Sequence, residues 1–262
     1  MNTGKIILMM LSLTFAVFAE AQKIDSVKKD TVHLIKEYHF RGTVSATNNG
    51  ISFVPTFTLG KPAAIVNLSV GSNRLSFEPE FRASLEGKPW SFIFWGRYKI
   101  VQNKHFKLHV GAHPAVAFNT IKVTENGKTK EVIQGQRFLA AEIAPNYFIN
   151  KNTSVGVYYI VAHGVEIGAV QYTHFLTLNA GFSNIHLSKD FVLRIAPQVY
   201  YLKMDKKDGF YTSSTLTLSN KKYPFSLSYL MNKEIKSNIV TKQFNSNVTL
   251  SYAFGNTFYK KG

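Results

Sequence analysis

The segment LSFEPEFRASLEGKPWSFIFWGRYK, residues 75–99, alternates between apolar and polar side chains on both sides of a turn at Gly87-Lys88-Pro89. Phe77 and Phe81 alternate with charged residues before the turn, and Phe92 and Phe94 alternate with Ser91, Ile93 and Trp95 after it. Successive side chains of a β-strand point to opposite faces of the sheet. This segment is therefore predicted to form a long hairpin with one aromatic face and one more polar, charged face.

The same alternation returns along most of the chain, and it predicts an all-β fold. Most of the predicted strands reach the ~9–11 residues of a tilted membrane strand, whereas strands of soluble proteins average ~5–6 residues. Small and polar residues on one face with aromatic residues on the other are typical of a transmembrane antiparallel β-barrel. A soluble barrel or sandwich would alternate in the same way, but the strand lengths and the aromatic strand ends favour the membrane. We expect about 12 strands, with 14 as the alternative, over residues 51–59, 63–70, 75–86, 90–100, 105–119, 136–149, 153–161, 173–187, 191–203, 209–219, 223–231 and 244–254.

The connections between the predicted strands differ in length. Polar segments such as 120–135 and 232–243 alternate with short turns such as 150–152 and 188–190. Outer-membrane barrels have short periplasmic turns and longer extracellular loops. Proline cannot donate to a strand ladder, so we expect bulges or interrupted strands at the prolines inside the predicted strands, which are Pro55, Pro79, Pro114, Pro145 and Pro197.

The N-terminus reads as an export signal. Lys5 precedes an apolar run over residues 6–18, and Ala19-Glu20-Ala21 has the small-x-small form of a cleavage site. A membrane-anchoring helix is the alternative interpretation. The chain has no cysteine, which excludes disulfides and thiolate chemistry. The predicted organisation is a signal peptide (1–21), a periplasmic or lumen-inserted lead (22–50), the barrel (51–254) and a short C-terminal tail (255–262).

The net charge is strongly positive, +16 with a sequence pI of about 9.8. In a cytosolic protein this would suggest nucleic acid, but an exported chain rarely meets it. Anionic lipid headgroups or acidic solutes fit the charge better. The expected partners are outer-membrane lipids, lipopolysaccharide and small solutes, with no nucleic acid, and the expected location is the bacterial outer membrane.

The charged face of the opening hairpin is expected to face the barrel lumen. A tight turn that pairs Leu85 with Trp90 would place Glu78 opposite Arg97. Two interpretations remain open: a plug of salt bridges, or a pore lining that sorts solutes by charge. The charged residues predicted to line the lumen are Glu78, Glu80, Arg82, Arg97, Lys99, Lys107, His109, Glu142 and Arg194.

Aromatic residues at strand ends are expected to form girdles at the lipid interface. His105, His109 and His113 share one strand face, but a separation of four residues is ~13 Å along a strand, too far for a shared metal ion. We therefore expect no metal or cofactor and assign no catalytic residue. The predicted interface aromatics are Trp90, Tyr98, Tyr201, Tyr223 and Phe254.

The signal peptide, the motif GKPWSFIFWGRYK and the terminal SYAF resemble the porin-like outer-membrane β-barrel proteins common in Bacteroidota, over about residues 51–254. The resemblance implies a barrel in the outer membrane of a Gram-negative bacterium and recognition by the barrel assembly machinery through a terminal aromatic residue. Phe254 is followed by GNTFYKKG, so either an internal signal or Phe258 would serve. The predicted function is a porin-like transport channel for small solutes, with anions favoured by the positive net charge. The alternatives are a closed structural or interaction barrel that binds lipopolysaccharide or a surface partner, and a lipid-modifying enzyme.

Overall fold

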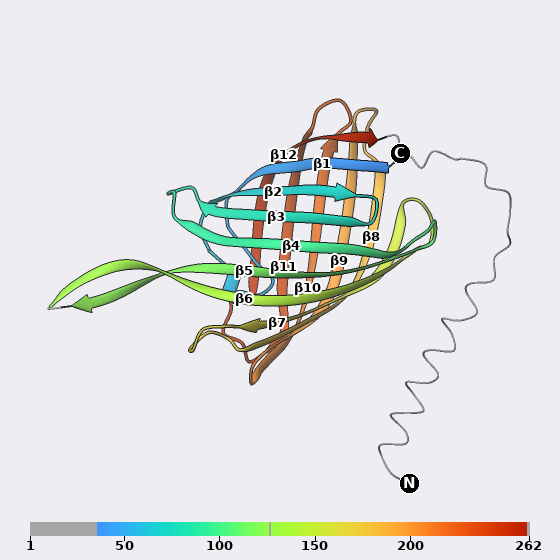
Figure 1. Ribbon diagram of the computed structural model, residues 1–262. Coiled ribbons are helices and arrows are strands. Elements are labelled where there is room, and N and C mark those ends of the chain that lie inside the picture. The colour runs from blue at the N-terminus through green and yellow to red at the C-terminus, as the bar shows by residue number, and fades with distance from the viewer. Residues whose placement is uncertain (1–35, 126, 261–262) are drawn as a thin grey trace, which may run out of the picture. The chain divides into compact units, whose positions relative to one another are not determined.

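The chain forms a closed antiparallel barrel of twelve strands in the computed structural model, which describes residues 36–125 and 127–260. Each strand pairs with its neighbours in sequence, and β1 pairs with β12 to close the barrel (Figure 1). The predicted fold class and strand count are confirmed. The predicted signal peptide, residues 1–21, lies outside the described residues. The strands are β1 (Lys36–Thr47), β2 (Ala63–Ser72), β3 (Leu75–Ser84), β4 (Pro89–Gln102), β5 (Phe106–Glu125), β6 (Lys128–Phe148), β7 (Thr153–Gly164), β8 (Tyr172–His186), β9 (Phe191–Met204), β10 (Lys207–Asn220), β11 (Phe225–Ser237) and β12 (Phe244–Lys260).

The two ends of the barrel differ in their connections. Lys36 pairs with Lys260, so β1 begins where β12 finishes. This end, which we call the turn end, also carries the short connections 73–74, 103–105, 149–152, 187–190 and 221–224. The opposite end, the loop end, carries the connections 48–62, 85–88, 126–127, 165–171, 205–206 and 238–243. Only the loop-end connections 48–62, 165–171 and 238–243 are longer than those of the turn end, and the polar segment 120–135, predicted as a long connection, lies mostly in β5 and β6.

The first strand is not where the sequence pattern suggests. β1 covers residues 36–47, inside the segment predicted as a lead, and the predicted strand 51–59 belongs instead to the connection 48–62. Pro55 begins a 3-10 turn there, and Gly60 has a φ of 72°, a backbone conformation that a strand does not use. The strand count remains twelve because one strand is lost and another gained. β12 also continues to Lys260, so most of the predicted tail 255–262 is barrel wall.

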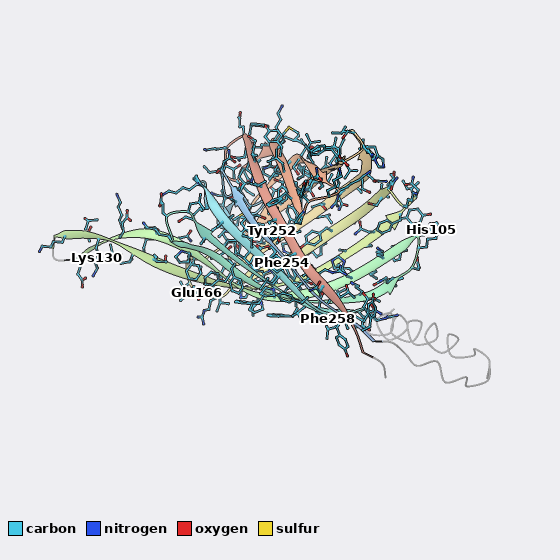
Figure 2. The ribbon with its side chains drawn as sticks, turned by 90° about the horizontal axis from the view of Figure 1, so that it is seen from above. His105, Lys130, Glu166, Tyr252, Phe254 and Phe258 are labelled. Carbon is cyan, nitrogen blue, oxygen red and sulfur yellow. The ribbon has the colours of Figure 1, made fainter. Side chains whose placement is uncertain are left out.

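The barrel presents apolar side chains outward and polar side chains inward. Along β1, Tyr38, Phe40 and Val44 are exposed, whereas Ser45 and Thr47 are buried. Phe40 contacts Phe254 of β12, with ring centroids 6.2 Å apart, and Tyr252 and Phe254 follow one another along the same strand (Figure 2). Within the described ranges no helix is long and apolar enough to cross a membrane.

Prolines are accommodated by interrupting the ladder toward one neighbouring strand. Pro79 pairs with Phe94 of β4, but the β2–β3 register breaks between Glu80 and Phe77. Pro114, Pro145 and Pro197 likewise pair on one side and sit in a register gap on the other. The missing N–H thus costs one ladder contact on one side without moving the register. Pro55 lies in a loop, so no strand is disturbed there.

The β3–β4 hairpin pairs in a different register from the expected one. Glu78 lies opposite Trp95, and Arg97 lies opposite Ser76. The register also shifts between Arg82 and Ala83, beside the turn, where a bulge adds one residue to the β4 strand. Away from the bulge the displacement is two residues, which leaves each side chain on its predicted face.

Two strand glycines give a matched test of the close packing at the turn end. A Cβ on Gly71 would collide with the backbone of Leu75 and Ser76, whereas a Cβ on Gly96 would meet only the Ala112 carbonyl oxygen at 3.8 Å. We expect Gly71→Ala to lower the free energy of unfolding by about 1–3 kcal/mol, the usual range for overpacking. Gly96→Ala should leave it near the wild-type value. Urea unfolding of the refolded protein, followed by its gel mobility, measures both, and equal stability of the two variants would contradict the described packing.

Candidate functional site

The connection 48–62 folds into the lumen instead of leaving the barrel. Its ends are held together by the hydrogen bonds from Gly50 N to Lys61 O, 2.7 Å, and from Leu59 N to Gly50 O, 2.9 Å. Inside it, Phe57 packs against Phe138 of β6, with ring centroids 5.0 Å apart. We call residues 48–62 the inner loop.

Trp90 anchors the inner loop to the wall. Its Nε1–H donates to the carbonyl oxygen of Phe57 at 2.7 Å, and only 3% of the residue is exposed. The Arg82 guanidinium lies over the indole ring, 4.9 Å from its centroid. Trp90 was expected at the lipid interface, and that expectation is wrong: the bulge beside the turn rotates the side chain from the outer face to the lumen.

The inner loop reaches opposite parts of the wall through aromatic contacts. On one side, Phe57 packs against the cluster that contains Trp95 and Phe138. On the other side, Phe53 packs against Phe175 at 6.0 Å and against Tyr200 at 5.5 Å between ring centroids. Because these clusters belong to β4–β6 and to β8–β10, the loop spans the lumen between them.

The strongest charge cluster lies along the wall. Glu142 of β6 is fully buried as a side chain and accepts hydrogen bonds from Arg97 Nε at 2.6 Å and from the Tyr158 hydroxyl at 2.7 Å. His109 Nε2 lies 3.4 Å from Glu142, and Arg97 also pairs with Glu78. These residues come from β3 to β7, which are consecutive strands. The predicted salt bridges therefore form a band on one wall and do not cross the lumen.

The other charged residues predicted for the lumen are arranged singly or in a local pair. Glu80 and Arg82 form an ion pair on β3. Lys99 lines a lumen cavity, and the Lys107 ammonium lies 4.8 Å from the centroid of the Phe148 ring. Arg194 is exposed on β9, on the strand face that Gln198 shares.

Most of the predicted interface aromatics are exposed or half-buried on the barrel. Tyr98 and Tyr223 are exposed, and Tyr201 packs on Phe210 while its hydroxyl donates to Asp208 at 2.9 Å. Phe254 stacks with Tyr252, with ring centroids 6.4 Å apart. Among the predicted interface residues Trp90 alone turns to the lumen.

The inner loop divides the lumen into cavities. A cavity of about 600 Å³ lies toward the turn end, lined by residues that include Lys99, His109 and Gln198. Two cavities of about 240 Å³ each flank the loop toward the loop end. Phe53 lines all three, so its ring is the partition between them. Arg97, Tyr158 and Phe175 join Phe53 in lining both the large cavity and one of the small ones.

Several residues of this site were absent from the sequence prediction. Phe53 and Phe57 were placed in a strand, where their role as a partition could not be seen. Tyr158, Phe175 and Tyr200 follow the alternation, but their aromatic rings face inward. The signal that was available is GISFVPTF, residues 50–57, where glycine and proline bracket two phenylalanines.

Within residues 36–125 and 127–260, one hydrogen bond inside the barrel joins a histidine and a serine. His39 Nε2 lies 2.9 Å from Ser69 Oγ, on the faces of β1 and β2 that point to the lumen. Among the residues described here, no carboxylate forms a salt bridge or hydrogen bond with His39. The pair therefore lacks the orienting partner of a catalytic triad and does not lie on the lipid-facing rim.

Known proteins share the architecture without close sequence similarity. No family model and no curated protein matches the chain. An outer membrane channel from Pseudomonas putida F1 aligns with a TM-score of 0.50 at 9% identity, over 89% of this chain and 100% of that chain. The KdgM porin in complex with disordered oligogalacturonate gives 0.47 at 12% identity, covering 82% and 99%, and the NanC porin gives 0.44 at 11%, covering 85% and 99%. At these identities the likeness shows the fold alone: the chain folds as a bacterial outer-membrane, porin-like β-barrel.

The buried carboxylate of Glu142 makes the charge band sensitive to the loss of its partner. We expect Arg97→Leu to lower the free energy of unfolding by about 3 kcal/mol, because it leaves a buried charge without compensation. The double substitution Arg97→Leu/Glu142→Leu should recover most of that loss. Lys99→Leu, which breaks no ion pair among the described residues, is the control. Equilibrium unfolding followed by circular dichroism measures all variants, and a fully stable Arg97→Leu protein would refute the arrangement.

Proposed function

We propose that the protein is a porin-like channel that passes small solutes across the outer membrane, with a preference for anions. The observation that carries this proposal is the cavity of about 600 Å³ inside the barrel, which polar and charged residues line. The salt bridges lie along the wall beside this cavity and leave its centre free. Side chains that closed the barrel would fill its lumen and would leave no cavity of this size.

The preference for anions rests on the distribution of lumen charges. Arg41, Lys99, Lys107 and Arg194 lie on lumen-facing positions in the half of the barrel toward the turn end. In the part of the chain that the structure describes, none of these four residues forms an ion pair. Charges of one sign between low-dielectric walls raise the local concentration of the opposite ion. The two carboxylates of the charge band, Glu78 and Glu142, share the guanidinium of Arg97, so the band opposes the four cations with one excess negative charge.

Ion selectivity tests the proposal directly. Refolded protein in a planar bilayer should give stable current steps, and its reversal potential in a KCl gradient should indicate anion preference. The triple substitution Lys99→Gln/Lys107→Gln/Arg194→Gln should lower the anion-to-cation permeability ratio several-fold, as expected for the loss of like-signed charges in a confined path. Lys122→Gln/Lys128→Gln/Lys130→Gln, which removes three lysines that line no lumen cavity, is the matched control. Silence from folded protein would overturn the channel, and an unchanged ratio would overturn the selectivity.

The inner loop should set the size of the conducting path. Because Phe53 separates three cavities, we expect Phe53→Ala to connect them and to raise single-channel conductance at least two-fold. Val54→Ala removes a neighbouring side chain of the same loop and should change conductance much less. A Phe53→Ala channel with wild-type conductance would show that ions bypass the inner loop.

A second candidate function is docking of a surface partner, and the β5–β6 hairpin favours it. β4 pairs with β5 only as far as Ala117, and β7 pairs with β6 only from Phe138 onward. Residues 118–125 and 128–135 therefore form strand pairs only with each other and project beyond the barrel rim, with Lys130 near the tip (Figure 2). At the base, Arg137 Nε donates to Glu166 at 2.5 Å, and this hydrogen bond lowers the pKa of the Glu166 carboxyl. Lipopolysaccharide phosphates are the proposed partner of the tip lysines.

Removal of the hairpin tip separates the two candidate functions. We expect a variant in which Gly-Ser replaces residues 121–133 to fold and conduct like the wild type, because these residues touch no lumen cavity. Its binding to lipopolysaccharide vesicles should fall. Loss of conductance in a correctly folded tip variant would contradict the assignment of transport to the lumen alone.

A further inference from the structure

One of the small cavities flanking the inner loop has an unusual lining. It holds about 240 Å³ and lies between the loop residues Phe53 and Phe57 and the wall residues Trp95, Phe138 and Phe175. With Tyr158, six Phe, Tyr or Trp rings thus surround a single space. The cavity is below the ~300 Å³ at which sites for drug-sized ligands begin, so it suits a ligand of a single ring. We call it the aromatic chamber.

One buried polar atom inside the aromatic chamber is left without a partner. Among the described residues that line the chamber, His113 Nδ1 is buried and makes neither a hydrogen bond nor an ion pair. Glu80 Oε1 and Arg82 Nε are also buried in the lining, but they form an ion pair with one another. Only 7% of His113 is exposed, and its ring packs edge-on against Trp95, with ring centroids 4.1 Å apart. Unpaired buried polar groups of this kind call for a bound molecule or water.

The charges around the aromatic chamber leave no free cation for an anionic ligand. Glu80 is matched by Arg82, and Arg97 is shared by the two carboxylates Glu78 and Glu142, so these carboxylates and guanidiniums carry one negative charge in excess. An anionic ligand would meet this excess charge, and any ionised ligand would lose hydration in a partly buried site, which is costly. A neutral ligand avoids that cost and still finds donors in Arg82 and acceptors in Glu80.

We propose that the aromatic chamber binds a neutral sugar ring of about the size of one hexose. Such a ring has apolar C–H faces that pack on aromatic side chains and hydroxyls that both donate and accept hydrogen bonds. The chamber adjoins the large cavity, with which it shares the lining residues Phe53, Arg97 and Phe175. This proposal rests on the proposed channel function and identifies neutral sugars as a class of solute that binds within the conducting path. The cationic residues at the turn end set the preference among ions.

Intrinsic fluorescence tests the site without any conductance measurement. The chain has two tryptophans, and Trp95 lines the aromatic chamber. Refolded protein in detergent is titrated with D-glucose, D-galactose and D-mannose, and with glucuronate and galacturonate as charged analogues. We expect a saturable change with at least one hexose and at least tenfold weaker binding of its uronate. The site is overturned if no hexose saturates the signal, or if a uronate binds as tightly as its hexose.

Calorimetric titration of variants in the inner loop and in the barrel wall measures hexose affinity independently of fluorescence. Thr56→Val removes a hydroxyl from a residue that lines the chamber, and His113→Phe removes the imidazole whose Nδ1 has no partner among the described residues. Each should weaken the hexose about tenfold, the usual cost of one lost polar contact in a buried site. Gln198→Ala, which changes only the large cavity, should bind normally. If His113→Phe does not refold, Thr56→Val decides. If folded protein that carries no current binds a hexose saturably, the binding site stands and the proposed transport is overturned. If the protein conducts but binds no hexose, the proposed transport stands and the binding site is overturned.

Discussion

The hydrogen bond from the Trp90 indole to the Phe57 carbonyl connects the barrel wall to the inner loop, 2.7 Å between Nε1 and O. A bulge beside the β3–β4 turn brings the indole inward, and the buried bond then fixes where Phe53 and Phe57 lie. Loss of a buried hydrogen-bond partner costs more than the bond itself contributes. The positions of the lumen cavities follow from this contact, because the loop it holds is the partition between them.

The remaining lumen chemistry is divided along the barrel axis. Unpaired cations lie toward the turn end, paired charges lie in a band at mid-height, and aromatic rings meet the inner loop above them. Each layer avoids a different free-energy cost. The unpaired cations keep contact with water, the buried charges have partners of opposite sign, and the aromatic rings are removed from water. A solute that enters from either end would meet all three environments in turn.

The alternation of side chains was sufficient to predict a twelve-stranded membrane barrel, since period-two patterning depends only on the pleat and on the two solvents. Residues such as Glu78, Arg97 and Glu142 were predicted on the lumen face, and the structure brings them together. The pattern failed at Trp90 and at 51–59. A bulge moves a side chain to the opposite face of the strand, and the surrounding sequence pattern does not reveal it. The segment FVPTFTL alternates as a strand would, although Pro55 begins a 3-10 turn there. Such departures depend on tertiary contacts that local periodicity does not contain.

The central claim is that Phe53 stands in the solute path. The chain has no native cysteine, so Phe53→Cys gives a single reactive site. Its current can be recorded in a planar bilayer before and after addition of a bulky, water-soluble methanethiosulfonate reagent. The account predicts that modification at residue 53 reduces the current of each channel to a small residual value, and that the reductant dithiothreitol restores it. Complete modification, verified by mass, with no change in current would contradict the placement of the inner loop in the conducting path.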